Sequence, residues 1–271
     1  MDVHHLNCCP MHPFGKRFIN GEGSYLEPAE LVTHCLLLDV SGGLILVDTG
    51  LGRLDLHDPS RLGTLVNLTM NPSRSPDPTA YTRISNLGYD PAEVKHIFVT
   101  HLDMDHVGGL ADFPEASIHL LEEEYQAAQD PPLMERLRYR QQLWEHNPNW
   151  TPYSSRGEDW FGFPSLQPLP DEVPELRMVP LPGHSAGHCG IAVKQNDGWL
   201  LHCGDAYFDA NEMSPDDPSC TPGLRLQQKM ISHDNRVRIE TQNKLRDLIK
   251  HSEVDTVCSH SPEEYREFSS R

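Results

Sequence analysis

The chain has 271 residues, of which 37% are hydrophobic and 23% are charged, so it is long enough to bury a sizeable core. Its formal net charge of −18 argues against DNA or RNA as a substrate, because nucleic-acid binding needs a basic surface. The sequence has no apolar run of about 18 residues that could span a membrane, and its N-terminus lacks the pattern of a secretion signal. We therefore expect a cytoplasmic protein, monomer or homodimer, that acts on a small molecule.

The first half of the chain predicts strands that alternate with short helices. Apolar segments at 31–40 and 43–48, separated by Ser41-Gly42, are typical of a β-hairpin that ends in the turn Asp48-Thr49-Gly50. Residues 51–80 are rich in proline and polar side chains, which predicts a long loop with one short helix. This half is completed by four further expected elements: a short helix at 91–95, strands at 96–100 and 117–121, and a helix that begins at 122 and runs to 129.

The second half repeats this alternation after an aromatic-rich stretch at 130–175. Its tryptophan, tyrosine and phenylalanine side chains stand among prolines and glycines, and a helix is expected at 136–145. The stretch is either a cap over a site or a satellite core beneath a long loop. Further elements are expected after it: strands at 176–181, 189–194, 199–203 and 255–259, and one long helix at 226–251. The whole chain, 1–271, is therefore expected to form one layered α/β domain.

A cluster of metal-ligand side chains follows the strand expected at 96–100. Within six residues the sequence places His101, Asp103, Asp105 and His106. Burying this much charge without a partner is costly, so the cluster indicates a metal site rather than four satisfied imidazoles and carboxylates. Three more candidates come directly after later strands: His184, Asp205 and His260. Because strand ends converge at one sheet edge in a layered α/β fold, we expect the seven side chains to meet.

These motifs resemble the metallo-β-lactamase superfamily, whose usual signature reads HxHxDH and continues with His, Asp and His in the same order. The strand that leads into Asp48-Thr49-Gly50 matches as well, and the resemblance spans about residues 30 to 262. It implies an αββα sandwich of two mixed sheets flanked by helices, with two metals at one edge. The segments LVTHCLLLD, ILVDTG, LPGHSAGH and SHSPEEY look most like the lactonase branch, which includes the acyl-homoserine lactonases.

Carried over position by position, the resemblance implies how the ligands divide. The first metal takes His101, Asp103 and His184. The second metal takes Asp105, His106 and His260. Asp205 falls where the family's carboxylate bridges the two metals together with a hydroxide. The implied cofactors are two divalent ions, of which zinc is expected and iron or manganese is an option at the Asp103 position. His188 is expected to support a ligand rather than to bind metal.

Asp103 departs from the family pattern, because most members have a histidine there. Flavin-linked diiron members also carry a carboxylate at this place, but they depend on a flavodoxin-like domain that this chain has no room for. Two divalent ions with Asp105, Asp205 and a hydroxide leave a formal charge of +1, and Asp103 brings it to zero. This position is therefore expected to be less electrophilic or to favour a harder ion.

A tyrosine is the second departure. The acyl-homoserine lactonases place a catalytic tyrosine three residues after the bridging aspartate, and this chain has Phe208 at that position. Tyr207 precedes it and is a candidate catalytic residue, although strand alternation would normally point it elsewhere.

The implied function is the hydrolysis of a small ester or lactone. Two close metals lower the pKa of bound water, supply hydroxide and polarise a carbonyl, and Asp105 is a candidate for passing a proton to the leaving alkoxide. Other hypotheses remain open: a phosphodiester or thioester hydrolase, an iron-dependent oxidoreductase that Asp103 would favour, and a protein that binds metal without catalysis.

Overall fold

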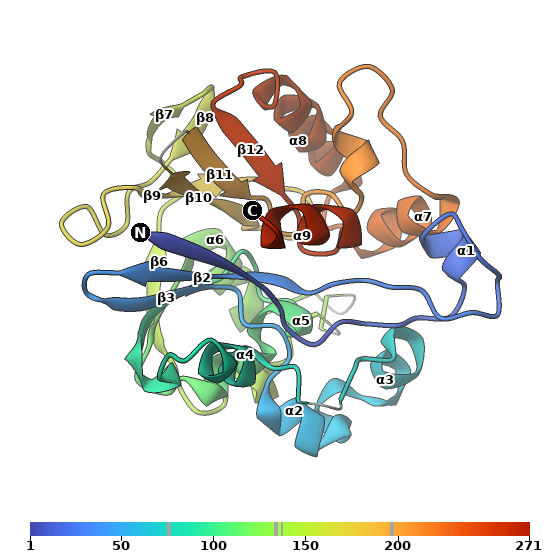
Figure 1. Ribbon diagram of the computed structural model, residues 1–271, viewed down its shortest axis with the longest axis horizontal. Helices are drawn as coiled ribbons and strands as arrows, with labels where there is room; N and C mark the ends of the chain where they lie inside the picture. Colours follow the sequence, from blue (N-terminus) through green and yellow to red (C-terminus); the bar gives the residue numbers. More distant parts are fainter. Residues whose placement is uncertain (75–76, 133–134, 137, 196–197) are drawn as a thin grey trace.

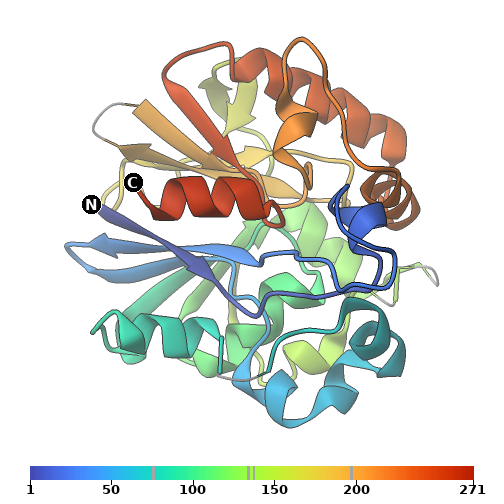
Figure 2. The ribbon, with the colours of Figure 1, turned by 45° about the vertical axis from the view of Figure 1, so that its right-hand side comes forward.

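The structure, a computed structural model, describes residues 1–74, 77–132, 135–136, 138–195 and 198–271. Two β-sheets lie face to face through the middle of the molecule, and helices cover their outer faces (Figures 1 and 2). This arrangement confirms the predicted αββα sandwich. In the described ranges, no helix is both long enough and apolar enough to cross a membrane.

The first sheet has six strands, which lie in chain order. They are β1 (Asp2–Asn7), β2 (His34–Val40), β3 (Gly43–Val47), β4 (Val94–Phe98), β5 (Ser117–Leu121) and β6 (Asn149–Tyr153). The first three strands are antiparallel and the last three add in parallel, so the sheet is mixed, as predicted. The expected hairpin is β2–β3, with Leu36 opposite Val47. Strand β1 was not expected, because it is a half-exposed edge strand with a polar sequence.

The second sheet has four strands in the order β12-β11-β10-β9. Their bounds are β9 (Leu176–Pro180), β10 (Cys189–Gln195), β11 (Gly198–His202) and β12 (Val254–Val257). All four were predicted to within two residues. The pairs β9–β10 and β10–β11 are antiparallel and β11–β12 is parallel. A separate ribbon pairs β7 (Glu158–Trp160) with β8 (Phe163–Ser165).

The apolar runs of the central strands supply both faces of the first sheet. In β2, Leu36 and Leu38 face the second sheet, while Cys35 and Leu37 face the helices on the other side. This period of two follows from the pleat, and burial on both faces explains why the strands read as continuous apolar runs. The core between the sheets is completed from the second sheet by residues such as Met178, Ile191, Leu200 and Val257.

Most helices are short. Their bounds are α1 (Lys16–Ile19), α2 (Arg53–His57), α3 (Thr64–Met70), α4 (Ala80–Asn86), α5 (Met104–Val107), α6 (Glu122–Gln129), α7 (Pro222–Ile231), α8 (Asn235–Leu248) and α9 (Pro262–Ser269). The long helix expected at 226–251 is wrong, because the chain breaks at 232–234 between α7 and α8. The helix expected at 136–145 is also wrong: the described residues form turns and one 3-10 turn, η4 (Gln141–Leu143), while residue 137 lies outside the described ranges.

The aromatic side chains of 130–175 pack against the body of the domain. Trp150, on β6, contacts Tyr125 and Trp144, and Trp160 is only 5% exposed beside Trp199. Whether other parts of this stretch cap a site stays a prediction.

Candidate metal centre

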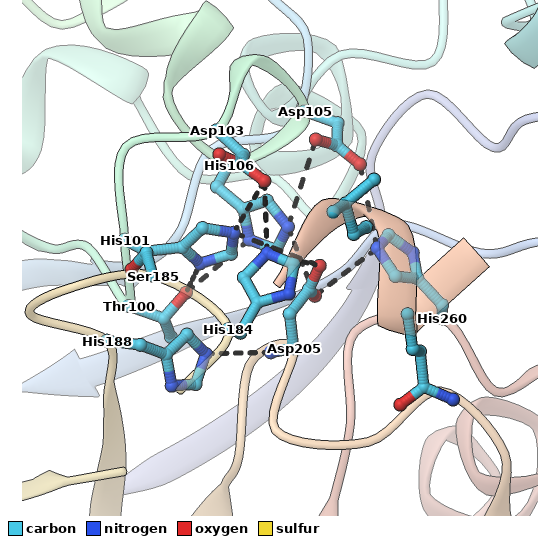
Figure 3. A network of polar contacts seen from close by, with 12 residues as sticks. Thr100, His101, Asp103, Asp105, His106, His184, Ser185, His188, Asp205 and His260 are labelled. Carbon is cyan, nitrogen blue, oxygen red and sulfur yellow. Dashed lines mark hydrogen bonds and ion pairs between the residues drawn. The ribbon is translucent and has the colours of Figure 1, made fainter. Parts of the chain in front are cut away.

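All seven side chains that the sequence singled out as ligands meet at one edge of the two sheets (Figure 3). They form two adjacent groups, and within each group one ligand atom per residue lies within 4.8 Å of the others. The first group is His101, Asp103, His184 and Asp205. The second group is Asp105, His106 and His260. These two sets are called the first group and the second group below.

Each ligand candidate stands just beyond a strand. His101 follows β4, His184 follows β9, Asp205 follows β11, and His260 lies between β12 and α9. Asp103 is the N-cap residue of the one-turn helix α5, which carries Asp105 and His106. The 3-10 helix η3 (Gly108–Asp112), which directly follows α5, packs closely on the turn after β3, since a Cβ atom on Gly109 would come within 2.9 Å of Thr49 Cβ. Glycine is therefore required where the segment after the ligand helix meets this turn.

Three of the four histidines have their orientation fixed through Nδ1. Thr100 Oγ1 lies 2.9 Å from His101 Nδ1. Asp48 Oδ2 lies 2.7 Å from His106 Nδ1, and the carbonyl oxygen of Val32 lies 2.8 Å from His260 Nδ1. Each contact leaves Nε2 facing the middle of the cluster, which is how histidine ligands are commonly oriented and their tautomer set.

Asp205 stands between the two groups with one oxygen toward each. Its Oδ2 lies 3.8 Å from His101 Nε2 and 3.5 Å from His184 Nε2. Its Oδ1 lies 3.3 Å from both His106 Nε2 and His260 Nε2. A single carboxylate therefore faces the ligand atoms of both groups, as a bridging ligand must.

The donor atoms fit metal ions better than they fit one another. Among the described residues, His101 Nε2, His106 Nε2 and Asp205 Oδ1 are buried without a hydrogen-bond partner. Ligand atoms about 2.0–2.1 Å from a tetrahedral zinc ion stand about 3.4 Å apart, close to the separations found between these atoms. Nitrogen and carboxylate oxygen are also ligands that zinc, iron and manganese accept. The two groups can therefore hold metal ions.

The charges of the two groups differ. Burial lowers the pKa of His260, but Asp205 and Asp105 outweigh burial and raise it to about 9. Burial and then the nearby Arg138 lower the pKa of His184 to about 4. An imidazole that binds a metal must be neutral. Metal binding at the second group therefore has to displace the proton of His260, whereas His184 in the first group is already neutral near pH 7.

Two carboxylates that sequence reasoning did not assign support the cluster from behind. Asp48, in the turn after β3, accepts hydrogen bonds from the backbone N–H and the hydroxyl of Thr100 as well as facing His106. Burial raises the pKa of Asp48, but His106 lowers it further, so the pKa lies below its usual value. Asp48 belongs to the turn Asp48-Thr49-Gly50, which the sequence motif contains, but its partner His106 lies 58 positions further along the chain.

Glu124, in the first turn of α6, ties the two loops of the first group together. Its buried carboxylate accepts hydrogen bonds from the N–H of Leu102, the hydroxyl of Ser185 and the N–H of Gly187. His188 supports the same group from another side, since its Nε2 accepts a hydrogen bond from the N–H of Asp205. The sequence signal for Glu124 is absent, because three adjacent glutamates at 122–124 look like an exposed helix start.

Arg138 is the unexpected neighbour of the first group. Its Nε lies 2.9 Å from Asp103 Oδ1, and its Nη1 donates to the carbonyl oxygen of His184 at 2.6 Å. Burial raises the pKa of Asp103, but Arg138 and His101 outweigh it and hold the pKa well below its usual value. The stretch around Arg138 carries no motif, so this contact arises only from the fold.

Tyr207 is not brought to the cluster. Its fully buried side chain packs in the core behind the second sheet, and its hydroxyl donates to Glu264 Oε1 at 2.9 Å. Phe208 instead contacts the rings of His184 and His260. The turn that contains Asp205 therefore directs the phenylalanine toward the candidate ligands and the tyrosine into the core.

Comparison with known proteins places this geometry in a family. Residues 29–250 match the metallo-beta-lactamase superfamily. A probable metallo-hydrolase of Mycobacterium tuberculosis is 38% identical over 268 residues, which cover 97% of this chain and 81% of the relative. An N-acyl homoserine lactonase of Bacillus cereus is 28% identical over 200 residues, or 72% of this chain and 73% of that protein.

A solved structure shares the fold over nearly the whole chain. It is an N-acyl homoserine lactone hydrolase with the product N-hexanoyl-L-homoserine bound at its catalytic metal centre. The TM-score is 0.72 at 19% identity, covering 98% of this chain and 95% of the other. With the ligand geometry, the sandwich fold and these matches in agreement, the chain belongs to the metallo-β-lactamase superfamily, and its fold is similar to that of lactone hydrolases.

Proposed function

We propose that this protein is a dinuclear metal-dependent hydrolase that cleaves a small ester or lactone. The observation that carries the proposal is the position of Asp205, whose two oxygens face the histidines of both groups at 3.3–3.8 Å. A carboxylate placed in this way suits two neighbouring ions rather than one. The likeness to lactone hydrolases supports the substrate class.

The residues divide between the two ions as the groups do. His101, Asp103 and His184 would hold the first ion, Asp105, His106 and His260 the second, and Asp205 would bridge them; zinc fits both positions. Such a pair of ions lowers the pKa of bound water to near neutrality, provides hydroxide as a nucleophile and polarises a carbonyl.

The protein's own side chains prepare the site for this reaction. Asp48, Thr100 and the carbonyl of Val32 keep three imidazoles turned inward, so their Nε2 atoms need no rearrangement. The carboxylates of Asp103 and Asp105 are each 16% exposed, whereas the histidines are almost fully buried. A substrate therefore approaches from the side of the two aspartates.

Asp105 is placed to move a proton as well as to bind. Its partly exposed carboxylate lies at the more accessible side of the cluster, with Oδ2 3.6 Å from His260 Nε2. An alkoxide leaving group would be released on this side, and a carboxylate there can accept the proton given up by the attacking water and pass it to the alkoxide. Tyr207 has no part in this proposal, because its hydroxyl is engaged by Glu264.

Esters and lactones suit the site better than the alternatives. Their alkoxide leaving groups need little assistance, so one proton-transfer group is enough. A phosphodiester or a glutathione thioester would favour accessible basic side chains near the ligands, whereas Arg138 is buried and paired with Asp103. The net charge of −18 also gives little attraction for anions.

The test combines metal analysis with a substrate panel. Freshly purified protein should contain two divalent ions per chain and hydrolyse lactones or aryl esters, and a chelator should remove both properties until zinc is restored. Asp205→Asn should lose both ions, whereas Asp255→Asn, an exposed carboxylate on β12, should keep them.

Other outcomes would replace the proposal. Two irons with oxygen uptake would indicate an oxidoreductase, and turnover of bis-aryl phosphates or thioesters alone would change the substrate class. Tightly bound metal without turnover of any of these would indicate a metal-binding protein.

A further inference from the structure

Arg138 is a buried cation that contacts three oxygen atoms, one of which belongs to the carboxylate of the candidate ligand Asp103. Its side chain is only 8% exposed. The three nitrogens of the guanidinium contact Asp103 Oδ1, the carbonyl oxygen of His184 and the carbonyl oxygen of Ile231 at the end of α7. A buried guanidinium of this kind is costly unless it is paired, so its position is determined by these oxygens.

The contact divides the two oxygens of Asp103 between different tasks. Oδ1 faces Arg138 at 2.9 Å. Oδ2 faces the cluster, 3.0 Å from His184 Nε2 and 3.4 Å from His101 Nε2. Asp103 therefore offers one oxygen inward, as an imidazole offers one nitrogen.

We propose that Arg138 is the counter-charge of Asp103, a positioning residue that makes the aspartate equivalent in charge and in number of ligand atoms to the histidine common in this family. The inference rests on the proposed dinuclear site. Without Arg138, the extra carboxylate takes the formal charge of two divalent ions, their aspartates and a hydroxide from +1 to zero. Arg138 returns that charge to +1, so the first position remains a divalent site of ordinary electrophilicity.

Other charged groups nearby have partners of their own. Glu124, from α6, accepts its hydrogen bonds from Leu102, Ser185 and Gly187. Glu135 pairs with His233 at 2.6 Å in the link between α7 and α8. Asp103 is thus the carboxylate that contacts Arg138 directly. The combined formal charge of Asp103 and Arg138, which is zero, is the charge that acts on the proposed first ion.

A charge-compensation experiment tests this inference. The variants are Arg138→Gln, Asp103→His and the double substitution, each loaded with Co²⁺ and followed by visible absorption as the pH is varied. Removing a positive charge raises the pH at which an acid in the site loses its proton, and removing a negative charge lowers it. We expect the spectral midpoint to rise by about one pH unit in R138Q and to fall by about one unit in D103H.

The double variant gives the decisive result. Its charge equals that of the wild type, so its midpoint should return to within about a third of a unit of the wild-type value. Arg136→Gln removes the same charge from an exposed side chain two residues away and should leave the midpoint unchanged. Arg138→Lys keeps the charge but not the fork of donors, and should also stay close to wild type.

Each contrary outcome has a separate meaning. If the midpoint of R138Q does not move, or if the double variant stays displaced with R138Q or loses its metal, Arg138 only clamps the two carbonyl groups and the inference is wrong. If R138Q fails to fold, a displaced midpoint in R138K overturns the inference in the same way. If the wild type takes up no Co²⁺ or Zn²⁺, the proposed function itself fails.

Discussion

The two groups of the centre are supported by different parts of the molecule. The second group rests on the first sheet: His106 is held by Asp48 in the turn after β3, and His260 by the carbonyl of Val32 just before β2. The first group has Thr100, which follows β4, beside His101, but it takes further support from outside the sheets, from Glu124 on α6 and Arg138 in the stretch after it. Both kinds of support join segments that are far apart in the chain: Val32 lies 228 positions from His260, and Arg138 lies 46 positions from His184.

This difference also appears in how each group is charged. The second group pairs histidines with carboxylates, so the pKa of His106 is well above its usual value despite the lowering effect of burial. In the first group, Arg138 faces Asp103, and burial followed by Arg138 lowers the pKa of His184. In the second group, carboxylates balance the charge of the histidines, whereas in the first group Arg138, which is not a candidate ligand, balances the charge of Asp103. Different substitutions should therefore disrupt the two groups.

The largest effect is expected when the sheet support of the second group is removed. Asp48→Asn places an amide where three donors now converge, so at least one buried donor loses its acceptor. We expect a loss of about 3–5 kcal/mol in the free energy of unfolding and a 10- to 100-fold weaker second metal. Urea unfolding and metal titration measure the two quantities.

The matched control for this variant is Asp39→Asn. Asp39 lies on the neighbouring strand β2 and accepts a hydrogen bond from Tyr89. It should cost no more than about 1 kcal/mol and leave both metals bound. Equal losses in the two variants would contradict the special role of Asp48.

A smaller effect is expected at the first group from Glu124→Gln. The amide of the variant has only one acceptor oxygen for donors that belong to two loops, and its NH₂ group would face the remaining donors. The variant also lacks the negative charge of the carboxylate. We expect about 2 kcal/mol of lost stability and roughly tenfold faster release of one metal to a chelator, with the other retained. Glu123→Gln, an exposed neighbour, is the control, and release of both metals together would show that the groups do not depend on separate supports.

A change in stability of similar size, but without loss of metal, is expected from the pH dependence of the second group's surroundings. Burial raises the pKa of Glu264 from 4.5 to about 7, although hydrogen bonds from Cys258 and Tyr207 oppose the rise. The folded protein thus favours the protonated acid, so this stabilisation is complete below about pH 4.5 and is lost as the pH rises toward 7. Between pH 5.5 and 8 the wild type should lose about 2 kcal/mol more than Glu264→Gln, measured by urea unfolding. Parallel pH profiles for the two proteins would refute this assignment.

Patterns within short segments were enough to predict most of the strands and to single out the seven candidate ligands that the structure brings together. The strands of the two cores are apolar because both of their faces are covered, and the candidate ligands follow strands whose ends meet. The cluster at 101–106 was visible because so many metal-binding side chains are rare in one short segment. These features depend on neighbours in the chain.

The features that were missed depend on partners far away. Strand β1 is polar because half of it faces solvent, and its pairing with β2 gives it order. The prediction of a continuous helix at 226–251 was wrong because the N–H groups of His233 and Asp234 bond to carbonyl oxygens outside the helix. Arg138 could not be distinguished from its exposed neighbour Arg136, since nothing in the local sequence says which of them turns inward.

The break between α7 and α8 has a consequence for engineering this protein. At the break, the N–H groups of His233 and Asp234 bond to the carbonyl oxygens of His184 and Gly183, donors that an unbroken helix would have used internally. A linker with exposed residues is ordinarily a good place to graft a tag or to lengthen the chain. Here an inserted residue would shift the register of both bonds and move His184 with them. Designers should therefore treat residues 232–234 as part of the centre and place insertions elsewhere, such as the exposed turn at Ser41-Gly42.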